Sequence, residues 1–119
     1  MNDKNNERAK KMSFASIYPL YIDKVTRKNR TQEELDQVLC WLTGYTKKGL
    51  IDQIEKGVTL TQFFEEAPLF TPKAHLITGV ICGIRVEEMT DPLMQKIRYM
   101  DKVVDELFKG KTLEKIFRN

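Results

Sequence analysis

An all-α fold is predicted by three features of this sequence. Polar residues that begin helices and glycines that end them recur along the chain. Between these signals, apolar residues repeat with the period of an α-helix. Only 6 Gly and 4 Pro interrupt the 119 residues. A chain of this length forms one domain, so we expect a compact single-domain bundle of about six helices.

The first eleven residues, MNDKNNERAKK, depart from this pattern. After the initiator methionine their only apolar residue is Ala9, so they cannot bury enough surface to offset the entropy of ordering. We therefore expect residues 1–11 to be a disordered N-terminal extension and residues 12–119 to be a single helical domain. The extension holds four basic and two acidic residues, or +2 of the formal net charge of +3. The predicted domain is thus nearly neutral.

The clearest local signal lies at residues 31–44. Thr31 and Glu34 have the spacing of a capping box, in which each side chain accepts a hydrogen bond from a free backbone amide of the other residue. Gly44 is placed to end the helix in the left-handed conformation. The helix between these signals has one apolar stripe, which consists of Leu35, Val38, Leu39 and Leu42.

Similar signals predict the other helices. Their expected first residues are Ser16, Thr46, Thr59, Asp91 and Thr112. The polar stretch 27–30, Gly57, Pro68 and Gly110 end the first four. The predicted core of the bundle combines Leu35, Val38, Leu39, Leu42, Ile81, Ile84, Ile97, Met100, Val104 and Leu107.

The stretch HLITGVICGIRVEEM, residues 75–89, is the ambiguous part of the chain. Residues 76–86 are rich in β-branched side chains, which favour strands. Since no second β-rich run exists, a strand here would have to pair across a dimer. We therefore favour a buried helix and keep the strand as the alternative. In a helix, Gly79 and Gly83 would form a GxxxG pattern that allows close packing of another helix.

The same stretch supplies the candidate ligand or interface residues His75, Gly79, Gly83, Arg85 and Glu88. On a helix, His75 and Cys82 would be separated by about 10 Å of rise, whereas a base and its nucleophile must approach to about 3 Å. This spacing excludes a direct Cys-His dyad on a helix. Arg85 and Glu88 could bind a polar ligand, although surface charge or an arginine braced by carboxylates is the favoured interpretation.

A second group of candidates is basic. The candidate nucleic-acid contacts are Lys24, Arg27, Lys28, Arg30, Lys47 and Lys48. Two successive predicted helices around Gly44 permit a helix-turn-helix interpretation. The face of the second helix carries charges of both signs, however, and lacks the density of Arg, Asn and Gln that base recognition uses. Nucleic-acid binding is therefore an alternative hypothesis.

Several classes of chemistry have no support in the sequence. It contains no GxGxxG, GxxxxGK[ST], HExxH or GxSxG motif, and its 2 Cys and 1 His lack the spacing of a zinc site. We expect no cofactor and no metal. The longest apolar run is far shorter than the ~20 residues of a membrane span, and no signal-peptide pattern is present. Two buried free thiols and a cytoplasmic location are therefore expected.

Three stretches of the chain are specific enough to compare with known families. They are MSFASIYPLYIDKVTRKNRTQEELDQVLCWLTGY, FFEEAP and LITGVICGIRVEEMTDPLMQKIRYMDKVVDELFKGKTLEKIFR. Over residues 12–118 the sequence resembles a family of small bacterial proteins, domain of unknown function 2200. The resemblance implies a small, stand-alone, cytoplasmic bacterial protein. It brings no established activity, cofactor or catalytic residue.

The leading functional hypothesis is a small non-catalytic protein-interaction or structural module that can self-associate. It rests on a helical body without a recognisable catalytic motif and on the glycine pair. The alternative is a nucleic-acid-binding protein that uses the basic helix-turn-helix-like patch. The third hypothesis is a metal-free enzyme with a pocket near His75, Arg85 and Glu88.

Overall fold

The computed structural model describes residues 3–118, with side chains from residue 6 onward. The described chain is mostly helical, with one small antiparallel hairpin, so the predicted all-α class is confirmed. The helices and strands are α1 (Asp3–Lys11), α2 (Phe14–Thr26), α3 (Gln32–Thr43), α4 (Lys47–Lys56), α5 (Leu60–Glu65), the 3-10 helix η1 (Ala74–Leu76), β1 (Val80–Ile81), β2 (Ile84–Arg85), the 3-10 helix η2 (Val86–Glu88), α6 (Pro92–Phe108) and α7 (Leu113–Ile116).

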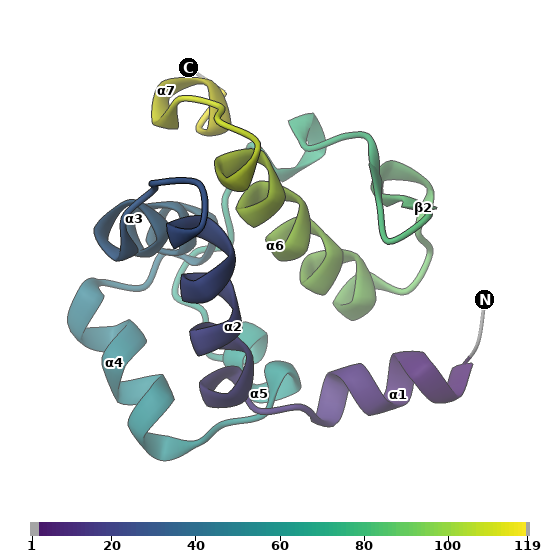
Figure 1. Ribbon diagram of the computed structural model, residues 1–119. Coiled ribbons are helices and arrows are strands. Elements are labelled where there is room, and N and C mark those ends of the chain that lie inside the picture. The colour runs from purple at the N-terminus through teal and green to yellow at the C-terminus, as the bar shows by residue number, and fades with distance from the viewer. Residues whose placement is uncertain (1–2, 119) are drawn as a thin grey trace.

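Helix α6 is the centre of the fold (Figure 1). It packs against α1, α2, α3, α5 and α7, and its other side contacts β1 and η2. Helices α2 and α3 lie on one side of α6 and the hairpin lies on the other (Figure 1). Segments that are distant in sequence therefore meet along this one helix.

The helix boundaries follow the capping chemistry of the sequence. The capping box of Thr31 and Glu34 is formed, and Gly44 ends α3 with a φ of +80°. A Cβ on Gly44 would lie 2.6 Å from the backbone nitrogen of Leu69, so this position also allows a close approach of the chain. Helix α2 begins at Phe14, earlier than expected, because Ser13 accepts a hydrogen bond from the amide of Ser16. The expected N-terminal caps of α4, α5, α6 and α7 also form, through Thr46, Thr59, Asp91 and Thr112.

Eight of the ten predicted core residues are buried, and the two exceptions are Ile81 and Ile84. Both are half-buried because they belong to the hairpin, which lies at the edge of the molecule. Aromatic side chains fill another part of the core, where the rings of Phe14 and Phe63 stack with centroids 4.1 Å apart. Burial of such large side chains is the dominant favourable term in folding.

The favoured helix at residues 76–86 is wrong, because this segment pairs with itself. Val80 pairs with Arg85 and Ile81 with Ile84, and the turn between the strands consists of Cys82 and Gly83. Both turn residues have positive φ, +53° for Cys82 and +75° for Gly83, as a type I′ hairpin turn requires. Gly79 also has a positive φ, of +108°. The two glycines therefore shape a hairpin and do not form a helix-packing motif, and the strand alternative needs no dimer.

The N-terminus also differs from expectation, since residues 3–11 form α1 where a disordered extension was expected. Several contacts hold the helix on α5 and α6. Ala9 packs against the core, the Lys10 Nζ lies 2.7 Å from a carboxylate oxygen of Asp91, and Thr61 donates a hydrogen bond to the carbonyl of Lys10. The sequence alone gave no sign of these long-range partners. Residues 1 and 2 of the expected extension lie outside the described residues.

Candidate functional site

His75, Arg85 and Glu88 are only partly brought together. Arg85 and Glu88 line an open pocket of about 420 Å³ beside the hairpin, and His75 is not among the lining residues. His75 is exposed in η1, and its Nδ1 lies 3.0 Å from the carbonyl oxygen of Pro72. The pocket thus lacks the histidine that the enzyme hypothesis placed in it.

Arg85 lies near two carboxylates of its own segment. It lies 3.7 Å from an oxygen of Glu87 and 3.6 Å from an oxygen of Glu88. The Glu87 carboxylate also accepts a hydrogen bond of 2.9 Å from the amide of Gly79. This backbone bond, assisted by the charge of Arg85, lowers the pKa of Glu87. Glu87 thereby connects the start of the hairpin to its end.

Two members of the predicted basic patch have structural partners. Arg30 forms a bidentate pair with Glu34, with Nη2 at 2.9 Å, and donates to the carbonyls of Leu107 and Lys111. Its side chain is only 15% exposed, so it closes the C-terminal end of α6 against the start of α3. The ammonium of Lys47 lies 3.1 Å from a carboxylate oxygen of Asp36.

Lys24 of the patch also has an acidic partner, whereas Arg27, Lys28 and Lys48 are exposed. The Lys24 ammonium bonds to Asp105 at 3.1 Å, and both Lys24 and Lys28 lie over the ring of Phe108. Burial would raise the pKa of Asp105, but hydrogen bonds from Lys24 and Lys109 outweigh it and lower that pKa. Arg27 and Lys48 are exposed, and neither forms an ion pair within the part of the chain that the structure describes.

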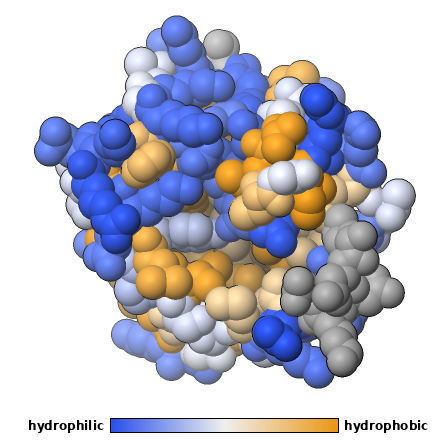
Figure 2. Space-filling model, turned by 45° about the vertical axis from the view of Figure 1, so that its right-hand side comes forward, coloured by the Kyte–Doolittle hydropathy of each residue, from blue (hydrophilic) through white to orange (hydrophobic). Residues whose placement is uncertain are grey.

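An apolar groove of about 250 Å³ lies where α1, α2, α5 and α6 meet. Its lining side chains are almost all apolar, apart from the phenol of Tyr21 and an ion pair at one end. We call it the apolar groove; it is lined by Ala9, Met12, Ile17, Leu20, Tyr21, Leu60, Ile97, Arg98 and Asp101. Figure 2 shows areas of apolar surface that border a hollow. Leu20 is 62% exposed and Met12 40% exposed beside the groove.

The polar end of the apolar groove is a compact hydrogen-bonded group. The Tyr21 hydroxyl donates to one carboxylate oxygen of Asp101 at 2.5 Å, and Arg98 donates to the other at 3.0 Å. Burial and the negative charge of Asp101 hold the pKa of Tyr21 well above its usual range. The Arg98 Nε is buried without a hydrogen-bond partner among the described residues. The group therefore offers fixed charges of both signs next to apolar surface.

Sequence reasoning missed the apolar groove because its lining comes from four helices. Leu20 is exposed, whereas Ile17 and Val25 of the same helix are buried. The unexpected α1 supplies Ala9. The sequence shows that Leu20 directly follows Pro19, but its exposure is evident only from the structure.

A second unpredicted cluster surrounds Asp36 in α3. Its carboxylate, whose side chain is 5% exposed, accepts a 2.5 Å hydrogen bond from the Tyr18 hydroxyl and pairs with Lys47. Burial, together with the bond to Asp36, raises the pKa of Tyr18 to about 12. Burial also raises the pKa of the neighbouring Cys40 thiol, which disfavours the nucleophilic thiolate. The cluster thus links α2, α3 and α4 and keeps its thiol protonated.

The cysteines differ from the expectation of two buried thiols. Cys40 is half-buried, and Cys82 is exposed at the tip of the hairpin. Within the described residues, no three His, Cys, Asp or Glu side chains are grouped so that they could hold a metal ion. None of the helices in that part of the chain combines the length and apolar character needed to cross a membrane.

The comparisons with other proteins agree with this architecture and give no function. In the crystal structure of the uncharacterized protein SP1917, a chain with 44% sequence identity has the same fold, with a TM-score of 0.88 over 94% of this chain and 92% of that chain. No curated protein matches the chain. The sequence model of a family described as "Uncharacterized protein conserved in bacteria (DUF2200)" matches residues 8–118. The chain therefore belongs to the DUF2200 family of uncharacterised bacterial proteins.

Proposed function

We propose that this protein is a small non-catalytic interaction module and that its apolar groove binds a second copy of the same chain. The exposed Leu20 beside the groove carries the proposal. Moving such a side chain from water to an apolar site contributes about 1.5–3 kcal/mol, and Met12 adjoins it on the same surface. The groove takes the place of the glycine pair as the basis for self-association, since Gly79 and Gly83 lie in the hairpin.

Self-complementarity favours a second copy as the occupant. A two-fold interface uses the same patch on both chains, so that patch must contain both a projection and a recess. Leu20 lines the groove and is 62% exposed, and the groove, of about 250 Å³, has room for the side chain of another leucine. Arg98 and Asp101 place a positive and a negative charge at one end of the groove. In a two-fold dimer, Arg98 of each copy can therefore face Asp101 of the other, without contact between like charges. The low formal net charge of +3 also limits repulsion between copies.

Sedimentation velocity over a wide range of protein concentrations tests this proposal. We expect a monomer–dimer equilibrium in the full chain. The variant Leu20→Glu should weaken dimerisation at least tenfold, because each dimer loses two apolar contacts and each ~1.4 kcal/mol corresponds to a factor of ten. Glu has a helix propensity similar to that of Leu, so α2 should remain folded, as circular dichroism would verify.

Leu69→Glu is the matched control, since Leu69 is 65% exposed but does not line the groove. It should leave dimerisation unchanged. A wild-type chain that stays monomeric at every accessible concentration would overturn the proposal. Equal weakening by both variants would also overturn it, because it would assign the effect to general surface charge.

Nucleic-acid binding is the second candidate, supported by the gathering of Lys24 and Lys28 around Phe108. The exposed Arg27 lies between these two lysines in the sequence. Binding through these cations should weaken steeply with added salt, and the double variant Arg27→Glu, Lys28→Glu should abolish it. Fluorescence anisotropy of a labelled oligonucleotide at two salt concentrations measures both effects. Binding that is unchanged both by added salt and by the double variant would reject nucleic-acid binding.

A further inference from the structure

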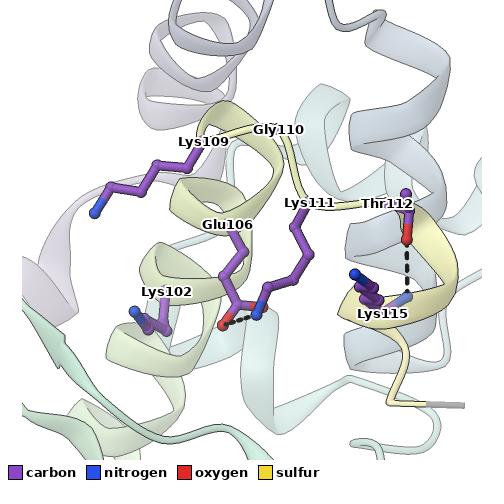
Figure 3. A pocket seen from close by; sticks show the side chains of 7 residues that line it. All are labelled: Lys102, Glu106, Lys109, Gly110, Lys111, Thr112 and Lys115. Carbon is purple, nitrogen blue, oxygen red and sulfur yellow. Dashed lines mark hydrogen bonds and ion pairs between the residues drawn. The ribbon is translucent and has the colours of Figure 1, made fainter.

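A second pocket, of about 430 Å³, lies beside the C-terminal half of α6 (Figure 3). It is bounded by α6, by the loop that follows it and by α7. Four lysines line this lysine pocket, namely Lys102, Lys109, Lys111 and Lys115. The lining contains one carboxylate, that of Glu106. The surface of the pocket is therefore strongly positive, on a chain whose net charge is small.

The charge of this single carboxylate is already neutralised by an arginine that does not line the pocket. Glu106 accepts two hydrogen bonds from the guanidinium of Arg118, at 2.6 and 2.9 Å. The Lys111 ammonium lies 3.6 Å from the second oxygen, which is beyond the range of a good hydrogen bond. The side chain of Glu106 is only 7% exposed and is fixed in the wall of the pocket by its pair with Arg118. It does not balance the charge of the remaining lysines.

The lysines of the pocket differ in their partners. Lys109 pairs with Asp105 at 3.1 Å and extends away from Glu106 in Figure 3. Lys102 and Lys115 form no ion pair or side-chain hydrogen bond within residues 6–118. Lys102 is half-buried, and the end of its side chain lies close to Gly79. Lys102, Lys111 and Lys115 are thus the cations available to a ligand.

Two half-buried cations elsewhere in the described chain are balanced by acids. Lys10 faces Asp91 at 2.7 Å, and Arg98 faces Asp101 at 3.0 Å. Isolated surface lysines are well solvated and need no explanation, but converging cations in a recess raise the local concentration of anions. The lining of the lysine pocket, in contrast, holds four lysines and one carboxylate.

We propose that the lysine pocket binds a small phosphorylated ligand that carries at least two phosphate charges. Lysine ammonium groups bind phosphate oxygens as point charges. The Thr112 hydroxyl oxygen accepts a hydrogen bond from the amide of Lys115, so its own hydrogen is free to be donated to the same anion. The volume lies within the ~300–1,000 Å³ of small-molecule sites, and it exceeds what a single phosphate ion would fill. This site is separate from the apolar groove and does not depend on self-association.

Isothermal titration calorimetry of the full chain with inorganic pyrophosphate tests the proposal. At about 0.15 M salt the screening length is ~8 Å, so only cations close to the ligand contribute strongly. We expect pyrophosphate to bind, inorganic phosphate to bind more weakly, and the double variant Lys111→Gln, Lys115→Gln to lose at least tenfold in affinity. Both lysines are exposed, and an unchanged thermal unfolding midpoint would show that the variant is folded.

The double variant Lys28→Gln, Lys48→Gln is the matched control, because it removes the same charge outside the pocket. It should bind pyrophosphate within twofold of the wild type. Three results would each overturn the proposal: no heat of binding at millimolar pyrophosphate, equal loss of affinity in both double variants, or tighter binding of a short single-stranded oligonucleotide through Lys111 and Lys115. The last result would assign these lysines to nucleic acid.

Discussion

Helix α6 and the hairpin segment that covers it, residues 73–90, are ordered by different means. Nine of the 17 residues of α6 are buried, and they include the centre of the core. In the hairpin segment the buried residues are Ile77 and Val86. Ala74, Ile81 and Met89 are only partly buried against the core. The turn of Cys82 and Gly83 and hydrogen bonds to backbone groups add to the order of the segment.

The hydrogen bonds of the hairpin segment connect it to its neighbours at few points. The side-chain amide of Gln95 in α6 donates to the carbonyl of Val86 at 3.0 Å, and the Arg118 Nε donates to the carbonyl of Leu76 at 3.4 Å. A region held in this way should open more easily than one held by a buried face. Order in this fold therefore has two sources, apolar burial in the helices and turn geometry in the hairpin segment.

A large-to-small substitution in α6 should have the largest effect on stability. Met100 is fully buried, so Met100→Ala removes apolar contacts and leaves a cavity. We expect the free energy of unfolding to fall by about 2–5 kcal/mol, as measured by urea denaturation. Leu69→Ala is the control on an exposed leucine and should change the same quantity by less than about 0.5 kcal/mol. Similar losses in both variants would break the assignment of α6 as the centre of the core.

A backbone substitution in the hairpin turn should have the next largest effect. Gly83 has a φ of +75°, and a Cβ placed there would meet no atom within 4 Å. The cost of Gly83→Ala is therefore purely conformational, about 1–2 kcal/mol. Gly83→Asn should recover much of it, because Asn tolerates the left-handed region. If urea denaturation gives equal losses for Ala and Asn, the turn geometry is not what orders the hairpin.

Removal of one methyl group from the hairpin anchor should cost less. Ile77 is fully buried, so Ile77→Val should lower the free energy of unfolding by about 0.5–1.5 kcal/mol. Hydrogen exchange should show the loss of protection first in residues 73–90, since Ile77 is one of the two buried side chains of this segment. Ile51→Val is the control, because Ile51 is 43% exposed. Uniform loss of protection across α6 would show that the two regions unfold together.

The two regions also differ in how far the sequence determines them. For α3, the capping box, the apolar stripe and Gly44 all agree, and helix start, face and end were predicted correctly. In the hairpin the β-branched residues from Ile77 to Val86 were interpreted as one element. Strands of two residues are too short for their alternation to be recognised in a sequence, and the turn pair Cys-Gly lacks the Asn or Asp that usually marks a type I′ turn.

The candidate sites could not be predicted from the sequence, because tertiary contacts bring their residues together. The lysine pocket combines residues from α6, a loop and α7, whose charges are interspersed with acids along the sequence. The predicted basic patch was dense in sequence, yet Arg30 and Lys47 are engaged by Glu34 and Asp36. Charge density along a chain does not reveal which cations already have partners, because those partners come from tertiary contacts.

The smallest expected effect concerns Glu87, which ties the two ends of the hairpin segment together. Glu87→Gln keeps an oxygen that can accept the Gly79 amide hydrogen bond but removes the charge. At pH 7 we expect only a minor change in the unfolding midpoint, because the carboxylate is exposed and exposed charge pairs contribute little. The unfolding midpoints of the wild type and of Glu87→Gln should differ in their dependence on pH under acidic conditions. The pKa of Glu87 in the folded chain is lowered from 4.5, so its contribution is complete above that value and is lost as the pH falls through the lowered pKa.

Thermal unfolding between about pH 6 and pH 3 measures this contribution. The wild-type midpoint should fall more steeply below about pH 4.5 than that of Glu87→Gln, because the wild-type carboxylate takes up a proton on unfolding and the amide does not. Glu88→Gln is the matched control, since Glu88 is adjacent and pairs with Arg85 but accepts no backbone hydrogen bond among the described residues. A slope change as large for Glu88→Gln would show that net charge, and not the bond to Gly79, sets the acid sensitivity. A slope change for Glu87→Gln alone would place local hydrogen bonding beside turn geometry as the source of order in the hairpin segment.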